Sequence, residues 1–290
     1  MDLTDVNTVK SILGECGFTF KKSLGQNFLT DSSVCPAMAE SSADKTAGVI
    51  EIGPGAGVLT RELAAKAKRV VAIEIDSRLK PVLNKTVGGL DNVEVIFADV
   101  LKTDLDRLIS ERFSDCSYVS VCANLPYYIT SPIITGLLSK RLNIKSITAM
   151  VQLEAAVRLC APLGTRDAGA VSAAVEYYSS PSLLFKVGRE CFVPSPKVDS
   201  AVIRLDIRKE PAVKVEDEKF FFLLIKSAFS QRRKTFLNSV SNTLNIEKSA
   251  LKNALCAVGL SEQVRGEEIT LSQFARISDM LCKNPKEEQL

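Results

Sequence analysis

Short runs rich in Val and Ile recur through the first two hundred residues, as expected for buried parallel strands. They cover residues 48–52, 69–75, 92–98, 117–123 and 146–152. Between them, residues 59–68 and 78–87 place apolar side chains at helical spacing. The alternation predicts an α/β fold with a doubly wound sheet, in which ligands bind beyond the carboxyl ends of the strands.

The pattern changes in the last third of the chain. Residues 182–187 and 200–207 read as two further strands, which could form an antiparallel edge, and a charged, Pro-containing segment follows at 209–217. Helical spacing then dominates, over residues 219–229, 235–243, 248–258 and 272–281. We therefore predict a first domain over residues 1–208, with an N-terminal arm at 1–45, and a small all-α C-terminal domain over 209–290.

Composition narrows the class of protein. The chain has 290 residues, 46% of them hydrophobic and 24% charged, and no stretch approaches the roughly 20 uninterrupted apolar residues of a membrane span. Its acidic start, Met1–Asp5, lacks the features of a signal or transit peptide, so we expect a cytoplasmic protein without a membrane partner. Eight scattered cysteines without a C-x-x-C pair favour reduced thiols over disulfides or zinc ligands.

The charged and titratable residues limit the chemistry. Histidine is absent, which removes the commonest general base and every Ser/His or Cys/His nucleophilic arrangement. The absence of histidine instead favours a reaction that depends on positioning of the reactants and on an activated cosubstrate. We expect no metal. The net charge of +3 is only mildly basic, so a nucleic-acid surface would require local clusters of Lys and Arg.

A glycine-rich loop follows the first strand. Residues 51–57 read Glu-Ile-Gly-Pro-Gly-Ala-Gly and lead into the helical segment at 58–63. Glycines such as Gly53 and Gly55 allow close backbone approach to a ligand, and the helix N-terminus attracts an anionic group. The spacing differs from the dinucleotide pattern G-x-G-x-x-G, because Val58 stands where the third glycine would be, and this disfavours NAD.

Two carboxylates stand at the ends of the next two strands, Glu74 near the end of one and Asp99 just after the other. Glu74 lies about twenty residues beyond the loop, where it could accept hydrogen bonds from ribose hydroxyls; the alternative is a solvated strand-end carboxylate. Asp99 could accept from an adenine amino group, or it could simply be a helix N-cap.

The tetrapeptide Asn124-Leu125-Pro126-Tyr127 ends the fourth strand at the same rim. The Asn124 amide oxygen and the main-chain carbonyl before Tyr127 could hold an exocyclic amino group, with the Tyr127 ring against the base. Such hydrogen bonds strengthen as positive charge develops on the nitrogen, so they would assist methyl transfer. A strand-ending turn is the alternative interpretation of this motif.

Five segments together resemble the small-subunit rRNA adenine N6,N6-dimethyltransferases. They are residues 21–31, 51–57, 124–130, 192–202 and 229–234, in the order of that family. The resemblance implies a Rossmann-like catalytic domain that uses S-adenosylmethionine. It also implies the residues that contact this cosubstrate, which are Asn27, Leu29, Gly53, Gly55, Glu74, Asp99 and Asn124.

The same resemblance implies the acceptor site and the substrate. Asn124, Pro126, Tyr127 and Phe192 would form the catalytic pocket, with Tyr127 and Phe192 on either side of the target adenine. The family adds two methyl groups to each of two adjacent adenosines in a hairpin near the 3′ end of 16S rRNA, late in small-subunit assembly. We therefore expect 16S rRNA in the immature small subunit as the partner, and a monomeric enzyme.

Basic residues cluster in two places that would suit this RNA. Lys226, Arg232, Arg233 and Lys234 lie at the start of the second domain with Phe229 among them, and Lys21 and Lys22 lie in the N-terminal arm. Such residues would neutralise phosphates and make binding salt-dependent. One departure from the family pattern stands at Ala168, where an aromatic residue usually precedes Gly169; it weakens inference about RNA contacts of the 164–171 loop.

Three alternatives stay open from the sequence. The related 23S rRNA adenine methyltransferases of macrolide resistance are similar, although the forms of the 51–55 and 124–127 motifs favour the small-subunit group. A ribosome-assembly factor that acts mainly by binding is a second alternative, and a DNA adenine methyltransferase is a third.

Overall fold

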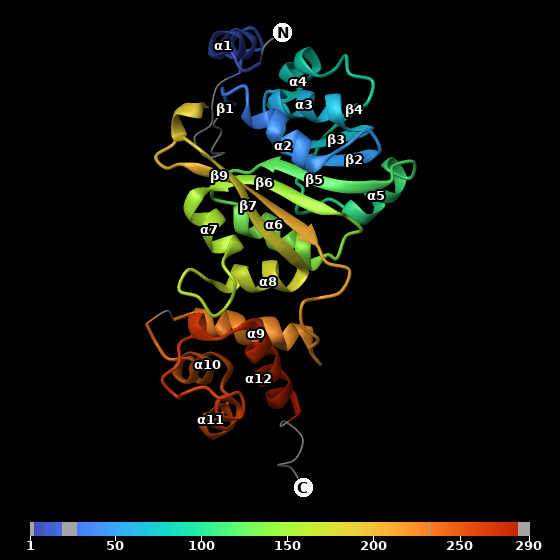
Figure 1. The fold of residues 1–290 in the computed structure, drawn as a ribbon. Coiled ribbons are helices and arrows are strands. Elements are labelled where there is room, and N and C mark those ends of the chain that lie inside the picture. The colour runs from blue at the N-terminus through green and yellow to red at the C-terminus, as the bar shows by residue number, and fades with distance from the viewer. Residues whose placement is uncertain (1–2, 19–27, 232, 284–290) are drawn as a thin grey trace. The chain divides into compact units, whose positions relative to one another are not determined.

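The structure, a computed structural model, describes residues 3–18, 28–231 and 233–283. The chain forms two compact units (Figure 1). The first comprises Met1–Ala156 with Ser182–Ile207, and the second comprises Val157–Pro181 with Arg208–Leu290.

A seven-stranded sheet with the strand order β4-β3-β2-β5-β6-β9-β7 organises the first unit. Strands β2, β3, β4, β5 and β6 pair in parallel, whereas β9 runs antiparallel to β6. Their bounds are β2 (Ala47–Ile52), β3 (Arg69–Glu74), β4 (Val93–Phe97), β5 (Tyr118–Asn124), β6 (Ser146–Gln152), β7 (Ser179–Val187) and β9 (Ser200–Ile207). The predicted doubly wound α/β fold is confirmed. The two late strands extend the sheet, with β9 antiparallel to β6 and β7 next to β9 at the edge.

Helices cover both faces of this sheet (Figure 1). Helices α2 and α3 pack on one face, where Met38 and Leu63 share a buried cluster with Val49 and Val70 of the central strands. Helix α6 lies on the other face (Figure 1). The bounds are α1 (Val6–Glu15), α2 (Val34–Ser42), α3 (Val58–Lys66), α4 (Lys80–Thr86, after a 3-10 turn at Ser77–Leu79), α5 (Leu105–Arg112), α6 (Thr130–Ser139) and α7 (Leu153–Cys160).

The N-terminal helix packs against α4. Val9, Ile12 and Leu13 of α1 share a buried cluster with Val82 and Leu83 of α4. Asp5 caps α1 by accepting hydrogen bonds from the Asn7 and Thr8 amides. The first described residues after the gap, Phe28–Leu29, form strand β1, which pairs with strand β8 (Phe192–Val193).

The second unit is built around large aromatic side chains. Its helices are α8 (Ala170–Tyr178), α9 (Glu218–Phe229), α10 (Phe236–Leu244), α11 (Lys248–Ala257) and α12 (Leu271–Lys283). The four helices predicted after residue 218 are therefore confirmed. Phe221, Phe236 and Phe274 are fully buried among them.

The boundary between the units differs from the expected division at residues 208–209. The cut after Ile207 agrees with it, but residues 157–181 belong with the second unit, although they precede β9 in the chain. The reason is that α8 packs on α9: Tyr177 and Tyr178 both donate hydrogen bonds to Glu218. The roles expected for the two domains, catalysis and RNA contact, stay predictions. Among the helices that the structure describes, none is long and apolar enough to cross a membrane.

Close packing at Gly48 in strand β2 gives a test of the sheet. A methyl group at Gly48 would lie 2.3 Å from Phe113 Cδ1, on the face opposite α2 and α3. We predict that Gly48→Ala lowers the free energy of unfolding by about 1–3 kcal/mol, because the Phe113 ring must move out of its packed position. Chemical denaturation measures this. Gly89→Ala is the matched control, since nothing lies within 4 Å of its added methyl group, and it should change stability little. Equal effects of the two substitutions would contradict the packing.

Candidate active site

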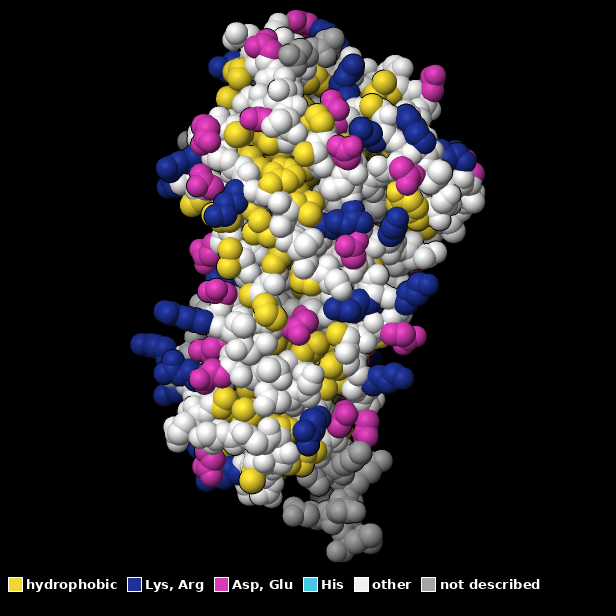
Figure 2. All heavy atoms as spheres, viewed as in Figure 1, with side chains coloured by type: hydrophobic (Ala, Val, Ile, Leu, Met, Phe, Trp, Pro, Cys, Tyr) yellow, Lys and Arg dark blue, Asp and Glu magenta, His cyan; other side chains and the backbone are white. Residues whose placement is uncertain are grey.

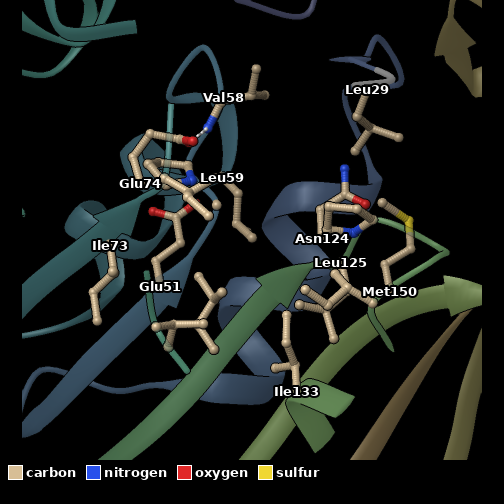
Figure 3. Close-up of a pocket in the computed structure, with 18 of the residues that line it drawn as sticks. Leu29, Glu51, Val58, Leu59, Ile73, Glu74, Asn124, Leu125, Ile133 and Met150 are labelled. Atoms are coloured by element: carbon tan, nitrogen blue, oxygen red, sulfur yellow. Dashed lines mark hydrogen bonds between the residues drawn. The ribbon is translucent and has the colours of Figure 1, made fainter. Parts of the chain in front are cut away.

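One cavity at the carboxyl ends of the parallel strands joins the two motifs. Its volume is about 160 Å³. The glycine loop after β2, Glu74 at the end of β3 and Asn124 at the end of β5 all line it. Figure 3 shows Glu51 and Glu74 on one side of this cavity, with Asn124 and Leu29 on the opposite side. The glycine loop and the 124–127 motif therefore meet in a single site.

The glycine loop has a backbone that only glycine adopts easily. Gly53, Gly55 and Gly57 have φ values of 72°, 58° and 89°. The Gly53 amide donates to the Ile73 carbonyl at 2.9 Å, which ties the loop to β3. Nothing lies within 4 Å of the position where a Cβ would stand on Gly53, so the space beside it is open to a ligand.

The Glu74 carboxyl is held in place by main-chain amides. Oε1 accepts from the Asp76 amide at 2.8 Å, and Oε2 accepts from the Gly55 amide at 3.3 Å. Burial raises the pKa of Glu74, and these hydrogen bonds offset part of the rise. Each oxygen keeps a further lone pair, so the carboxyl can still accept from ribose hydroxyls.

Asp99 lines the cavity and caps a turn rather than a helix, because the next helix, α5, begins at Leu105 and has Asp104 as its N-cap. Oδ1 accepts from the Leu101 amide at 3.0 Å, which fixes the turn after β4. Oδ2 lies 3.8 Å from Lys102 Nζ. The carboxylate is thus anchored at the cavity wall by the same turn that it stabilises.

Asn124 lies at the last position of β5, paired in register with Met150 of β6. Figure 3 shows its side-chain amide pointing into the cavity. The next residue continues the pairing, because the Leu125 amide donates to the Met150 carbonyl at 3.1 Å. The strand pairing therefore sets the position and direction of the Asn124 side chain.

The Pro126 carbonyl, which the sequence suggested as an acceptor for the substrate amino group, is already engaged. It accepts from the Ile129 amide at 3.1 Å and from the Thr130 hydroxyl at 3.2 Å, at the start of α6. Within the described residues, no hydrogen bond to the Leu125 carbonyl is found. Leu125 is thus the better main-chain candidate, and sequence spacing alone did not distinguish it from Pro126.

Tyr127 and Phe192 both line the cavity, as expected for aromatic faces beside a base. The Tyr127 hydroxyl is 2.8 Å from Ser200 Oγ, which fixes the ring, and burial raises the pKa of that hydroxyl. Phe192 is only 3% exposed. It is paired in register with Leu29, another lining residue, in the β1–β8 ladder. Their predicted contact with a target adenine stays a prediction.

Several other residues line the cavity that the sequence pattern did not single out. Ile75 and Tyr128 are each 60% exposed although they are large and apolar, and both stand at its rim. Glu51 lines the cavity from β2 and is fully buried. Ile75 and Tyr128 could have been inferred from the sequence, because each directly follows a residue assigned to the site.

The basic residues expected to bind RNA are only partly described. Lys226 near the end of α9, and Arg233 and Lys234 in the segment before α10, are exposed. Phe229 packs towards Phe274, with 6.4 Å between ring centroids, rather than standing free beside them. Lys21, Lys22 and Arg232 lie outside the described residues, as does the cosubstrate candidate Asn27.

Charges of both signs share the molecular surface. On the face that Figure 2 shows, Lys and Arg side chains alternate with Asp and Glu, and dark blue side chains gather at the left margin near the α9–α10 segment. The atypical residue Ala168 is buried and lies just before α8, in the second unit.

These residues fit the cosubstrate expected from the sequence. An open, glycine-lined loop, a ribose acceptor at Glu74 and a buried carboxyl at Glu51 surround one cavity. S-Adenosylmethionine carries an adenosine, whose ribose hydroxyls suit the acceptor Glu74. It also carries a positively charged sulfonium, which suits a cavity lined by the carboxyl groups of Glu51 and Glu74.

Comparison with known proteins agrees with this site. The family model for ribosomal RNA adenine dimethylase matches residues 17–283. The chain is 47% identical over 284 residues to ribosomal RNA small subunit methyltransferase A of Geobacillus thermodenitrificans, covering 97% of each chain. It is 46% identical to the protein of the same name from Bacillus pumilus, covering 97% of this chain and 98% of that one.

Two solved structures are similar as well. A dimethyladenosine transferase from Plasmodium falciparum matches with a TM-score of 0.70 and 26% identity, covering 86% of this chain and 95% of that one. The 23S rRNA methyltransferase ErmE matches with a TM-score of 0.66 and 27% identity, covering 88% and 99%. From the site and from these similarities, the chain belongs to the ribosomal RNA adenine dimethylase family.

Proposed function

We propose that this protein uses S-adenosylmethionine to dimethylate the N6 amino groups of two adjacent adenosines in the 3′-terminal hairpin of 16S rRNA. The observation that carries the proposal is the single cavity lined by the glycine loop, Glu74, Asn124 and Tyr127. The small-subunit names of the relatives at 46–47% identity favour this target over the large subunit. The reaction would take place in the cytoplasm, on immature small subunits, with a monomeric enzyme.

Bound S-adenosylmethionine would supply an electrophilic methyl group. The residues of this chain would contribute by positioning the substrate amino group. The Asn124 side-chain oxygen and the Leu125 carbonyl would accept hydrogen bonds from the two N6 hydrogens, and so orient the nitrogen lone pair towards the methyl group. Holding the reacting atoms in line can contribute on the order of 7–11 kcal/mol through lost freedom of motion.

No general base is needed for this chemistry. The N6 nitrogen becomes positively charged as it gains a methyl group, and it can then release a proton to water. Hydrogen bonds from N6–H to the Asn124 oxygen strengthen as this charge develops, so they stabilise the transition state more than the bound substrate. This agrees with a chain that contains no histidine.

The first test is transfer of labelled methyl from S-adenosylmethionine to small subunits that lack the modification. We predict dimethyladenosine with the wild type and a loss of about 10²–10³ in kcat with Asn124→Ala, because one acceptor of the developing charge is gone. Nucleoside analysis identifies the product. Methylation of large-subunit RNA would place the chain with the 23S enzymes instead. Normal subunit maturation by Asn124→Ala without methylation would favour an assembly factor.

Two substitutions at Tyr127 distinguish the contribution of its aromatic ring to activity from that of its hydroxyl. Tyr127→Phe removes only the hydrogen bond to Ser200, so we predict activity close to that of the wild type. Tyr127→Ala removes the stacking surface, worth about 1–3 kcal/mol, and should lower kcat/KM for RNA roughly 5- to 150-fold. Steady-state kinetics with varied RNA measures this, and Ser200→Ala is the matched control for the hydroxyl. Equal losses in the Phe and Ala variants would show that the ring does not stack.

The exposed basic residues Arg233 and Lys234 test the RNA surface. We predict that each change to Ala weakens RNA binding and reduces the slope of log affinity against log salt by roughly 0.7–0.9, as expected for one lost phosphate contact. Filter binding across a salt series measures this. Lys252→Ala is the control, because it removes the same charge from α11, where Lys252 pairs with Glu262. An unchanged slope for Arg233→Ala and Lys234→Ala would remove this segment from the interface.

A further inference from the structure

Glu51 is a buried carboxyl that the proposed function leaves without a role. It lies near the end of β2, is 1% exposed and lines the cavity. In the part of the chain that the structure describes, neither of its carboxyl oxygens has a hydrogen-bond partner, and the neighbouring Thr60 hydroxyl has none either. A buried carboxyl in this state is costly unless it is protonated or meets a positive charge.

The surroundings of Glu51 favour the protonated form. The pKa of Glu51 is raised to about 8, chiefly by burial and also by repulsion from the Glu74 carboxylate on β3. The dipole of the nearby Thr60 hydroxyl on α3 opposes the rise, although the two groups form no hydrogen bond. The other titratable groups that interact with Glu51 are the buried thiols of Cys35 on α2 and Cys122 on β5. None of these described groups is a cation, which favours a neutral Glu51 near pH 7 in the free site.

The cavity wall at Glu51 and Glu74 is therefore ready to compensate a positive charge (Figure 3). S-Adenosylmethionine brings one in its sulfonium, whereas the demethylated product, S-adenosylhomocysteine, has an uncharged thioether. The two molecules share the adenosine and the amino-acid group. A carboxyl that changes its charge state in response to the sulfonium would distinguish them.

We propose that Glu51 loses its proton to solvent when the sulfonium cosubstrate binds and regains a proton once the thioether product has formed, so that the site selects cosubstrate over product by charge. The O–H bond of the carboxyl breaks on binding, and the proton passes to the buffer. After methyl transfer the carboxylate again faces no cation, which favours reprotonation and weakens retention of the product. This inference rests on the cosubstrate of the proposed function and does not involve the RNA target.

The sign of the pH dependence follows from linkage. Below about pH 8 the free protein carries the proton and the cosubstrate complex does not, so binding releases a proton and the affinity for cosubstrate rises with pH. Above about pH 8 the free carboxyl is already ionised, and the dependence levels off. Glu74 is the expected ribose acceptor, and both ligands carry the same ribose, so its own titration largely cancels in the ratio of the two affinities.

Isothermal titration calorimetry of the full chain, without RNA, tests the proposal. S-Adenosylmethionine and S-adenosylhomocysteine are each titrated in phosphate and in Tris, whose different heats of ionisation report the protons released. At pH about 7 we predict release of close to one proton with the first ligand and clearly less with the second. The affinity ratio of the two ligands should rise roughly 30- to 50-fold between pH about 6 and 8.5, as expected for about two pKa units of coupling.

Glu51→Gln is the decisive variant, because Gln copies the shape of the neutral carboxyl and cannot ionise. It should abolish the difference in proton release and make the affinity ratio independent of pH. Glu62→Gln, a half-buried carboxyl on the same helix as Thr60, is the matched control and should behave as the wild type. Equal proton release for both ligands in the wild type, or an unchanged ratio in Glu51→Gln, would overturn the proposal.

Thermal unfolding of the ligand-free proteins gives an independent measurement. Between about pH 4.5 and 8 the folded wild type binds more protons at Glu51 than the unfolded chain does, so its stability falls as pH rises. The melting temperature of Glu51→Gln, relative to that of the wild type, should therefore increase as pH rises across this range. A constant difference would show that Glu51 is ionised in the free site. Absence of any cosubstrate binding by a folded wild type would instead contradict the proposed function itself.

Discussion

The parallel register of three central strands is the constraint on which the site depends. Ile52 of β2 pairs with Ile73 of β3 and with Ala123 of β5. The glycine loop, Glu74 and Asn124 each follow one of these residues, so they emerge at the same level of the sheet. A slip of one residue in either pairing would turn the corresponding side chains to the opposite face. The glycine loop, Glu74 and Asn124 come together because the hydrophobic interior fixes this register.

Main-chain hydrogen bonds then convert that register into a defined geometry. The Gly55 and Asp76 amides hold the Glu74 carboxyl, and Asp99 is fixed by the turn that it caps. On the acceptor side, the start of α6 engages the Pro126 carbonyl and leaves that of Leu125 available. Such groups need no rearrangement when a ligand binds. They can therefore stabilise developing charge without a free-energy cost of reorganisation.

The short β1–β8 ladder joins the two halves of the site. Leu29, a cosubstrate candidate, is paired with Phe192, an acceptor candidate, although 163 positions separate them in the chain. The Thr30 amide also donates to the Cys191 carbonyl at 2.8 Å, which extends the pairing. Movement of either segment must therefore affect the other, so the donor and acceptor sides are mechanically coupled through backbone hydrogen bonds.

The sequence by itself determined the elements whose pattern is local. The β-branched strand runs, the glycine loop and the four C-terminal helices could be read directly, because period and turn chemistry suffice for them. Helices α2 and α6 could not be read in this way. Helix α2 is buried over much of its surface, and α6 is apolar along most of its length, so neither shows a clear contrast between a polar and an apolar face.

Only the tertiary structure decided which carbonyl of the 124–127 motif is available, which unit holds residues 157–181, and that the Glu51 carboxyl is buried without a partner. Each of these depends on groups that are distant in the sequence. Whether a donor, a packing surface or a neighbouring charge reaches a given atom is set by long-range packing, and the local pattern of residues carries no information about it.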